Sequence, residues 1–576
     1  MSLVRERLLE RVLAGSTEPS ALEDVDTRGL YVAERAAWSL VWLGVLTAGI
    51  NVWGFWWSSP LTVALALVMV LAGVAGLTTT WLVRSPRSPL LQRCAFGGVM
   101  VSLLFPEAIV IHTRAFYQTD SAAFDQVSAR LLLQGHNPYT APLSSAARLL
   151  AVPARLWTYT TDGGHVAHAS YPAGSFLFEV PAVALGFGHM VVDWTDLFAW
   201  MVCGALFFVL LPASLRWLAG LLAMTPIFLG MFSSGGTDAM FLPFLVLAVW
   251  RWDRYGQPDS GVAGWIGPVA LGFACAIKQT PWFCVPILAT GIFLEARGSG
   301  RPAMRPTGRY LGTVGGVFFI VNLPFIVWQP AAWLHGTLLP FFGGLVAGGQ
   351  GLVTLATHGL SGGLSLTMLS VAALLAYITV MAAWVVWYPA LKRVWLLLMP
   401  VVFFFAPRSL SSYLVDLFPV AVVAVLSVHG APAITEMKRA LSPPGKRARL
   451  LLLPVIGVVV TSALAFSAHP LSIKVDGVQT AQGGRRLEAL TVTVQNLTGS
   501  SERPHFMVDT GAGTAGFWTS ARERDLVLAA HRSATLTLDA PVSTSAPQHG
   551  ARWLVEAYTA SPGTLSTSAL QIWAGR

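Results

Sequence analysis

The chain has 576 residues, of which 54% are hydrophobic and only 11% are charged, and its mean hydropathy is +0.62. A soluble domain carries about 25% charged residues, so this composition excludes an ordinary soluble protein and predicts that most of the chain lies in lipid. The formal net charge is +9, but the basic side chains gather in short connections between apolar stretches, a pattern that orients membrane proteins. From residue 470 onward nine basic side chains are balanced by eight acidic ones, so we expect no nucleic-acid partner.

The N-terminal 35 residues are polar and lack the apolar core of a signal peptide. We therefore expect residues 1–35 to form a cytoplasmic segment. Within it, Val4, Leu8 and Val12 recur at helical spacing, which predicts a short amphipathic helix at the cytoplasmic face of the membrane.

Fourteen apolar segments are candidate membrane-spanning helices, because a helix needs about 20 apolar residues to cross the hydrocarbon. They lie near residues 37–57, 61–83, 94–112, 173–190, 193–213, 216–231, 236–252, 261–278, 280–295, 309–329, 365–388, 393–406, 412–428 and 450–468. Together they predict a polytopic α-helical transmembrane domain over residues 36–469.

The distribution of basic residues predicts the orientation of these helices. Clusters at 84–93, 297–309 and 438–449 place their connections in the cytoplasm. Two long connections, 113–172 and 330–364, and the C-terminal part of the chain then lie outside. We expect a multi-pass protein of the plasma membrane.

The number of crossings must be odd if the N-terminus is inside and the C-terminus outside. One of the segments 173–190, 193–213 and 216–231 must therefore fail to span. Segment 173–190 is interrupted by Glu179 and Pro181, and segment 216–231 is too short for a straight span. We predict about thirteen crossings.

The C-terminal part has a different period, with apolar and polar residues alternating in Leu490–Val494 and Ala534–Leu538. Gly, Pro, Asn and Ser separate such stretches, so we predict an extracytoplasmic β-sandwich over residues 470–576 that could bind carbohydrate. Its tryptophans are interpreted as core aromatics, with a sugar-stacking surface as the alternative: Trp518, Trp553 and Trp573.

The outside connection 113–172 is far longer than a connector needs, and such loops are usually functional. Thr119 or Asp120 begins a predicted helix, which ends at Gly135 before Pro138. One apolar stripe runs along this helix, which we therefore expect to lie on the membrane surface: Phe124, Val127, Leu131 and Leu132.

Asp120 is the candidate general base of this connection. Asp120 and Asp125 are about 140° apart around a helix, so they are not expected to point into one site. Asp120 begins the helix beside the end of the third span, where its carboxylate could reach a cavity in the membrane. The alternative is an N-cap carboxylate that only satisfies backbone N–H groups.

Lys278 and Arg408 are candidate phosphate-binding residues on the outer side. Lys278 ends a span and could simply extend to the interface, although the outer side is less favoured for a positive charge. Arg408 lies in an outside turn, and a guanidinium suits phosphate through bidentate hydrogen bonds. Asp238 follows a glycine-containing outside turn, for which a plain structural role is the alternative.

Five histidines lie in the long outside connections, three in the first and two in the second. His136 belongs to the first, and His335 to the second, whose glycine-rich part could form a flexible loop over substrate. No HxxxH or HExxH spacing is present, so a divalent metal is unsupported and no cofactor is required.

The stretch Asp120–Tyr139, which ends in Leu-Leu-Leu-Gln-Gly-His-Asn-Pro-Tyr, resembles the first-loop signature of GT-C glycosyltransferases. The motif Tyr171-Pro172 at the start of the next apolar segment resembles a second element of that signature. The group resembled is the actinobacterial polyprenyl-phosphate-sugar-dependent enzymes, of the mannosyltransferase or arabinofuranosyltransferase type. The sequence departs from the pattern at Ala173, where the family has a second proline.

A later Lys-x-x-Pro element of the family is similar to Lys278 and Pro281. The resemblance covers roughly residues 110–420, but only the first-loop signature is specific. The β-sandwich lies outside it, although some members of the family carry β-domains that bind glycan.

The resemblance implies a membrane-embedded inverting transferase of cell-wall biosynthesis. Asp120 would deprotonate an acceptor hydroxyl, which attacks a sugar carried on polyprenyl phosphate, and Lys278 and Arg408 would hold that phosphate. The acceptor would be a lipid-linked glycan or a polysaccharide. The remaining candidate substrate-binding residues are Asp125, Asp238, His136, Asn137, Tyr139, Tyr171, His335 and Tyr413.

Two other classes of function stay open. A transporter or flippase of lipid-linked sugars would also be polytopic, but we find no convincing internal repeat of the kind that transporters show. A membrane-anchored glycan-binding scaffold would work through its β-domain and leave Asp120 dispensable. Sugar transfer from a polyprenyl donor, measured against uptake into proteoliposomes, separates these classes.

Overall fold

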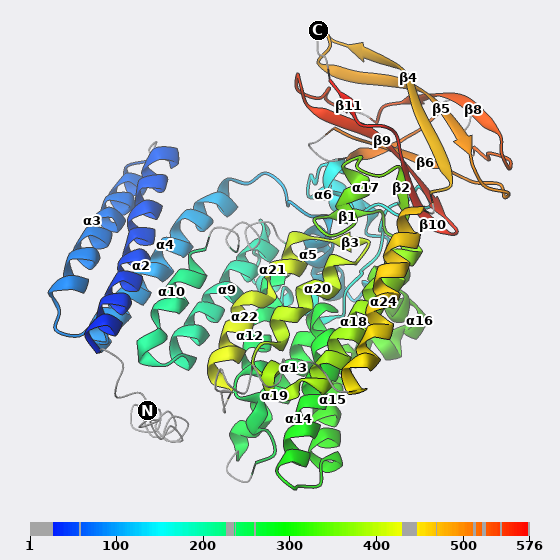
Figure 1. Cartoon of the computed structure of the whole chain (residues 1–576). Helices are drawn as coiled ribbons and strands as arrows, with labels where there is room; N and C mark the ends of the chain where they lie inside the picture. Colours follow the sequence, from blue (N-terminus) through cyan, green and yellow to red (C-terminus); the bar gives the residue numbers. More distant parts are fainter. Residues whose placement is uncertain are drawn as a thin grey trace.

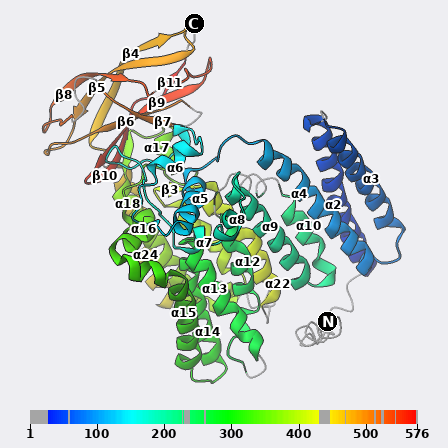
Figure 2. The ribbon, with the colours of Figure 1, turned by 180° about the vertical axis from the view of Figure 1, so that it is seen from behind.

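The computed structural model describes residues 27–56, 59–225, 228, 236, 238–257, 261–428, 446–467, 469–510, 514–520, 526–541 and 544–573. It consists of a helical body (described residues up to 467) and a β-domain (described residues from 469), which lies beyond one end of the body (Figure 1). Seen from behind, the connection between α14 (Cys284–Gly298) and α15 (Met304–Trp328) lies at the opposite end (Figure 2). The amphipathic helix expected near residues 4–12 lies outside the described residues.

Within the described ranges, six helices are long and apolar enough to cross a membrane. They are α2 (Thr27–Trp56), α3 (Pro60–Leu82), α4 (Pro89–Thr113), α9 (Val191–Leu210), α15 and α18 (Leu366–Val386). Large apolar side chains are exposed along them, such as Leu71 at 67% and Ile320 at 72%. Water disfavours such extended apolar surfaces, so these helices indicate association with a membrane.

The first of these helices begins earlier than expected. α2 starts at Thr27, so the end of segment 1–35 is helical rather than an irregular cytoplasmic tail. Glu34 is buried there and pairs with Arg87 at 2.6 Å, which provides a partner for a carboxylate near the start of an otherwise apolar helix.

The other apolar segments form helices with shorter apolar stretches. They include α7 (Gly174–Leu177), α8 (Val180–Ala184), α10 (Trp217–Ala223), α12 (Asp238–Val249), α13 (Ile266–Ile277), α14, α20 (Met399–Phe404), α22 (Leu417–Ser427) and α24 (Lys446–Ser467). Segment 173–190 is not one continuous helix, because Pro181 interrupts it and Gly186 adopts a positive φ of 86° after α8. These helix lengths do not establish thirteen crossings.

The second long connection, 330–364, is more ordered than a flexible loop. It begins with an apolar helix, α16 (Pro330–Phe342), which follows directly after α15. Farther on, β1 (Gly348–Gly349) pairs in parallel with β3 (Arg408–Ser409). Gly349 has a φ of 101°, and a Cβ there would lie 1.9 Å from the carbonyl oxygen of Ser409, so only glycine permits this close approach.

The β-domain contains two sheets that share one apolar core, as expected for a sandwich. One sheet has the order β4 (Leu471–Ala481), β5 (Arg486–Asn496), β8 (Ser533–Asp539). The other contains β10 (Gly563–Thr567), β9 (Arg552–Ala560), β6 (His505–Asp509) and β7 (Thr514–Trp518), with β11 (Gln571–Ile572) beside β9. The strands predicted near residues 490 and 534 are thereby confirmed.

The second sheet also includes a strand from the helical body. β2 (Gly363–Ser365), at the end of connection 330–364, pairs antiparallel with β10, and Leu364 lies opposite Leu565. The amide of Thr567 donates to the carbonyl of Gly362 at 2.9 Å. Along the chain the last described helix ends at Ser467 and the next strand begins at Leu471, but the two parts share a sheet in space.

The tryptophans of the β-domain belong to its core. Trp518 is 2% exposed and Trp553 is 4% exposed, and both lie between the two sheets. Trp573 packs on Trp553, with 6.2 Å between the ring centroids. The interpretation as core aromatics is confirmed for Trp518 and Trp553, which cannot form an exposed sugar-stacking surface.

Candidate active site between the helical body and the β-domain

The predicted helix of the first outside connection is α5 (Asp120–Leu133), and its ends are as expected. The hydroxyl of Thr119 caps it by accepting from the amide of Ala122 at 3.3 Å. Gly135 follows the helix with a φ of 79°, a conformation in which glycine is favoured. The N-cap is Thr119, so the carboxylate of Asp120 is free for another partner.

α5 is packed more extensively than its apolar stripe alone predicts. It packs against α6 (Ser144–Leu149), α7, α8 and α9, which bury its polar face as well. Asp125, Gln126 and Ser128 are all buried. The helix is therefore enclosed on both faces, and this arrangement holds its first turn inside the protein, while its place at the membrane surface stays a prediction.

Asp120 is 4% exposed and binds Thr158, a residue 38 positions farther along the chain. The backbone amide of Thr158 donates to Oδ2 of Asp120 at 2.5 Å, and the Thr158 hydroxyl donates to Oδ1 at 3.1 Å. The N-cap residue is therefore Thr119 rather than Asp120, although the carboxylate of Asp120 does accept from backbone amides, those of Thr158 and Ser121.

Arg408 reaches the same threonine from β3. Its Nη2 donates to the hydroxyl oxygen of Thr158 at 3.4 Å. Within the described part of the chain this is its single side-chain hydrogen bond, and it forms no ion pair there. A guanidinium has five N–H donors, so most of them remain available for a ligand. Thr158 thus joins the candidate base to the candidate phosphate-binding residue.

Burial raises the pKa of Asp120 above its ordinary value, while the Thr158 amide and the positive charge of Arg408 act to lower it. A carboxylate with a raised pKa holds a proton more tightly than an exposed one. The environment of Asp120 therefore favours proton acceptance, with Arg408 limiting how far the carboxylate is neutralised.

The β-domain covers this junction from the other side. Tyr159, next to Thr158, packs edge-on against Phe517 with 5.4 Å between the ring centroids. Tyr558 of β9 is buried, its hydroxyl donates to Oε2 of Glu556 at 2.9 Å, and the charge of Arg408 acts on its phenol. Burial, together with the nearby Asp509, raises the pKa of Glu556 to about 8.

Lys278, the second predicted phosphate-binding residue, is almost completely buried at 4% exposure. Its ammonium group pairs with Asp238 and also donates to the carbonyl of Gly236 at 3.2 Å. It lies 5.2 Å from the ring centroid of Tyr171 and 5.7 Å from that of Tyr413. Four predicted residues therefore meet here, but the charge of Lys278 is already compensated by Asp238.

Asp125 points away from Asp120, as their helical spacing predicts. It accepts from the hydroxyl of Ser175 at 2.9 Å, whereas Asp120 binds Thr158. Its second oxygen is buried without a hydrogen-bond partner among the described residues. Asp125 is thus part of the interior beneath the junction.

The remaining predicted residues divide into two groups. Tyr139 is buried and donates to the carbonyl of Tyr171 at 2.7 Å, and the side chain of Asn137 accepts from the amide of Tyr139 at 3.0 Å. These contacts shape the first connection. His136 and His335 are exposed, and neither forms a hydrogen bond with Asp120, Lys278 or Arg408 in the residues that the structure describes.

Several buried carboxylates were missed by the sequence interpretation. Asp193 pairs with Arg114 at 2.9 Å, and Glu179 accepts from the hydroxyl of Thr195 at 2.9 Å. Both oxygens of Asp196 are buried without a hydrogen-bond partner in the described chain. The signal was available, because an ionisable residue inside an apolar segment is a functional candidate by default.

No group of three or more His, Cys, Asp or Glu residues within the described ranges could hold a metal ion. The chain was also compared with protein-family models, curated proteins and solved structures, and none of these comparisons found a match. The geometry at the junction is therefore the main guide to function.

Proposed function

We propose that the protein is a membrane glycosyltransferase that moves a sugar from a polyprenyl-phosphate donor to a hydroxyl of a cell-envelope glycan or glycolipid. The observation that carries the proposal is the juxtaposition of Asp120 and Arg408 through Thr158. A carboxylate base and a guanidinium with unused donors are the two groups that this reaction needs from the protein.

Each group has a defined part in the proposed reaction. Asp120 accepts the proton of the acceptor hydroxyl as its oxygen attacks the anomeric carbon with inversion, after that hydroxyl replaces Thr158 at Oδ1. The bond from the anomeric carbon to the phosphate oxygen breaks, and the polyprenyl phosphate leaves. Arg408 binds the phosphate as negative charge develops on it.

Lys278 has a different part in this proposal from Arg408. Its ammonium is enclosed by Asp238, Tyr171 and Tyr413, and so it contributes a fixed field beneath the site. Tyr413 follows Arg408 closely in the chain. The Lys278 pair therefore supports the turn that carries Arg408, and Arg408 is the cation with donors to offer.

The proposal includes the membrane topology inferred from the sequence. The six long apolar helices support a multi-pass protein. To this the proposal adds about thirteen crossings, a cytoplasmic N-terminus and an outside β-domain, which are inferred from the apolar segments and the basic residues of the sequence. The candidate site would then lie on the outer side, where a lipid-linked donor and a growing glycan can meet.

The central test is a comparison of Asp120→Asn with Thr158→Val. Turnover is measured with a radiolabelled polyprenyl-phosphate sugar and an envelope glycan acceptor. If Asp120 is the base, Asp120→Asn should lower kcat by at least about 100-fold, because a general base contributes about 10²–10⁴-fold. Thr158→Val removes only a hydroxyl and should cost about fivefold, equivalent to about 1 kcal/mol.

The two variants also distinguish catalysis from structural anchoring. If Asp120 acts only by holding the hydroxyl of Thr158 in place, the two substitutions should lower turnover equally, and the base assignment is then wrong. If the wild-type protein transfers no sugar but takes up lipid-linked sugar in proteoliposomes, the transferase proposal itself is overturned in favour of a transporter.

A further inference from the structure

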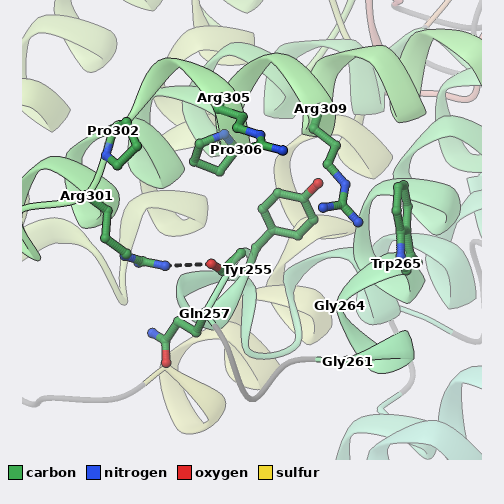
Figure 3. Close-up of a pocket in the computed structure, with 11 residues that line it drawn as sticks. Tyr255, Gln257, Gly261, Gly264, Trp265, Arg301, Pro302, Arg305, Pro306 and Arg309 are labelled. Atoms are coloured by element: carbon green, nitrogen blue, oxygen red, sulfur yellow. Dashed lines mark hydrogen bonds between the residues drawn. The ribbon is translucent and has the colours of Figure 1, made fainter.

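A cavity of about 420 Å³ lies at the end of α15 that is remote from the β-domain. Its described walls are residues 255–257 and 261–265, between α12 and α13, and residues 301–309 at the start of α15 (Figure 3). This volume falls within the range of about 300–1,000 Å³ typical of ligand pockets. The pocket is separate from the candidate active site and contains none of its residues.

Positive charge in this pocket is not compensated by the described residues. Three arginines and no carboxylate are among its described lining residues: Arg301, Arg305 and Arg309. Arg301 donates to the carbonyl of Gly256 at 2.6 Å, and the guanidinium of Arg309 lies 4.1 Å from the ring centroid of Trp265. Arg305 and Arg309 are one turn apart on α15, where like charges repel. Neither forms an ion pair with any described residue.

A neutral donor in the same pocket also lacks an acceptor. The hydroxyl of Tyr255 is buried without a hydrogen-bond partner among the described residues. Figure 3 shows it on the side of the pocket where Arg305 and Arg309 lie. Stacking on Trp265 leaves the N–H edge of Arg309 available. The described lining of the pocket therefore offers several hydrogen-bond donors and no negatively charged side chain. This is the arrangement that a phosphate group requires.

The surroundings of the pocket favour a phosphate that is attached to a lipid. α15 is one of the long apolar helices, and Leu311, two residues after Arg309, is 41% exposed. Trp265 and Ile266 on the neighbouring wall are 39% and 40% exposed. An acyl chain could lie along this apolar surface while its headgroup occupies the pocket, and tryptophan is typical of such interfaces.

We propose that this pocket binds the phosphate of an anionic phospholipid. Its arginines belong to the basic cluster 297–309 that predicts the cytoplasmic side, where anionic lipids concentrate and basic pockets between helices bind their headgroups. The headgroup phosphate accepts from Arg305, Arg309 and Tyr255. The proposal does not depend on the function of the opposite end, because its ligand and its test involve no turnover.

The test measures lipids retained by the full-length protein in nanodiscs of phosphatidylcholine with and without phosphatidylglycerol, by native mass spectrometry. The wild-type protein should retain phosphatidylglycerol preferentially. In the double variant Arg305→Gln/Arg309→Gln the preference for phosphatidylglycerol should be about tenfold weaker, because each arginine near an anionic membrane surface strengthens the binding of anionic lipid. The matched control, Arg84→Gln/Arg93→Gln, removes the same charge at two exposed positions outside the pocket and should retain it.

Two outcomes would overturn the proposal. Equal losses in the two double variants would show that only net charge attracts the lipid, without a pocket. The second outcome concerns inorganic phosphate added to the protein in phosphatidylcholine nanodiscs. If inorganic phosphate raises the melting temperature of the wild-type protein but not of Arg305→Gln/Arg309→Gln, and phosphatidylglycerol gives no such rise, the pocket binds a soluble phosphate. Tyr255→Phe sharpens the result, since it should weaken lipid retention without changing the charge.

Discussion

The two ends of the helical body handle charge in different ways. At the junction with the β-domain, Lys278 is paired with Asp238, and Arg408 shares Thr158 with Asp120. At the other end, Arg305 and Arg309 line a pocket whose described lining contains no carboxylate. Both ends are rich in cations, but of these four cations only Lys278 forms an ion pair with a described residue.

This difference separates cations that are held in a fixed position from cations that can bind an external anion. A buried cation with a fixed partner is held in one geometry, which suits a reaction whose charge develops in a known place. Cations without an ion-pair partner in the chain can still bind an external anion. The comparison therefore predicts that substitutions at the junction change folding, turnover or donor binding, whereas substitutions at the other end change only the binding of an external anion.

The largest effect is expected for Lys278→Met, which leaves Asp238 as an unpaired buried charge. Breaking a buried pair costs about 3–5 kcal/mol, so folded protein in detergent should largely disappear in size-exclusion chromatography. The double variant Lys278→Met/Asp238→Leu should recover part of that yield. A fully folded single variant would show that the pair is not a stability element, and the contrast between the two ends would be weakened.

Arg408→Ala should have the next largest effect and should act on the donor. Losing hydrogen bonds to a charged phosphate costs about 1.5–3 kcal/mol, which corresponds to a rise of roughly 10–100-fold in donor KM. Initial rates over a range of donor concentrations give this value, with Arg148→Ala as an arginine control elsewhere in the first connection. An unchanged donor KM would remove Arg408 from the phosphate site.

A smaller effect concerns the pH dependence of the β-domain. Glu556 has a pKa of about 8 in the folded protein, above that of an unfolded carboxyl, so the folded state binds more protons between these values. Stability should therefore fall as pH rises from about 4.5 to about 8 and then level off. Glu556→Gln should flatten this dependence in thermal unfolding from pH 5 to 9. The exposed Glu488→Gln should leave it unchanged, and an equal response of the two variants would contradict the assignment.

The smallest expected effect is an absence of coupling between the two ends. Asp120→Asn should keep the lipid preference of the remote pocket within about twofold, because sites without shared partners behave additively. Arg305→Gln/Arg309→Gln should likewise leave sugar transfer within about twofold. Native mass spectrometry and the transfer assay on both variants test this directly. Strong cross-effects would mean that the ends are linked through the body.

Local patterns predicted the elements of this protein well. The bounds of α5, with Thr119 before it and Gly135 after it, follow from capping residues that act within one turn. The strands β5 and β8 follow from alternation along single segments. Helix α16 was missed, although its composition is apolar, because the segment between two spans was interpreted only as a loop.

The sequence by itself determined that the chain is rich in apolar helices, carries a β-domain after residue 470 and places Asp120 at the start of a helix. Only the tertiary structure decided that Asp120 binds Thr158, that Arg408 meets the same threonine across 250 residues, and that β2 completes a sheet of the β-domain. The physical reason is range. Periodicity and capping act between neighbours in the chain. These contacts depend instead on how distant segments pack, and such packing produces no local sequence pattern from which it could be predicted.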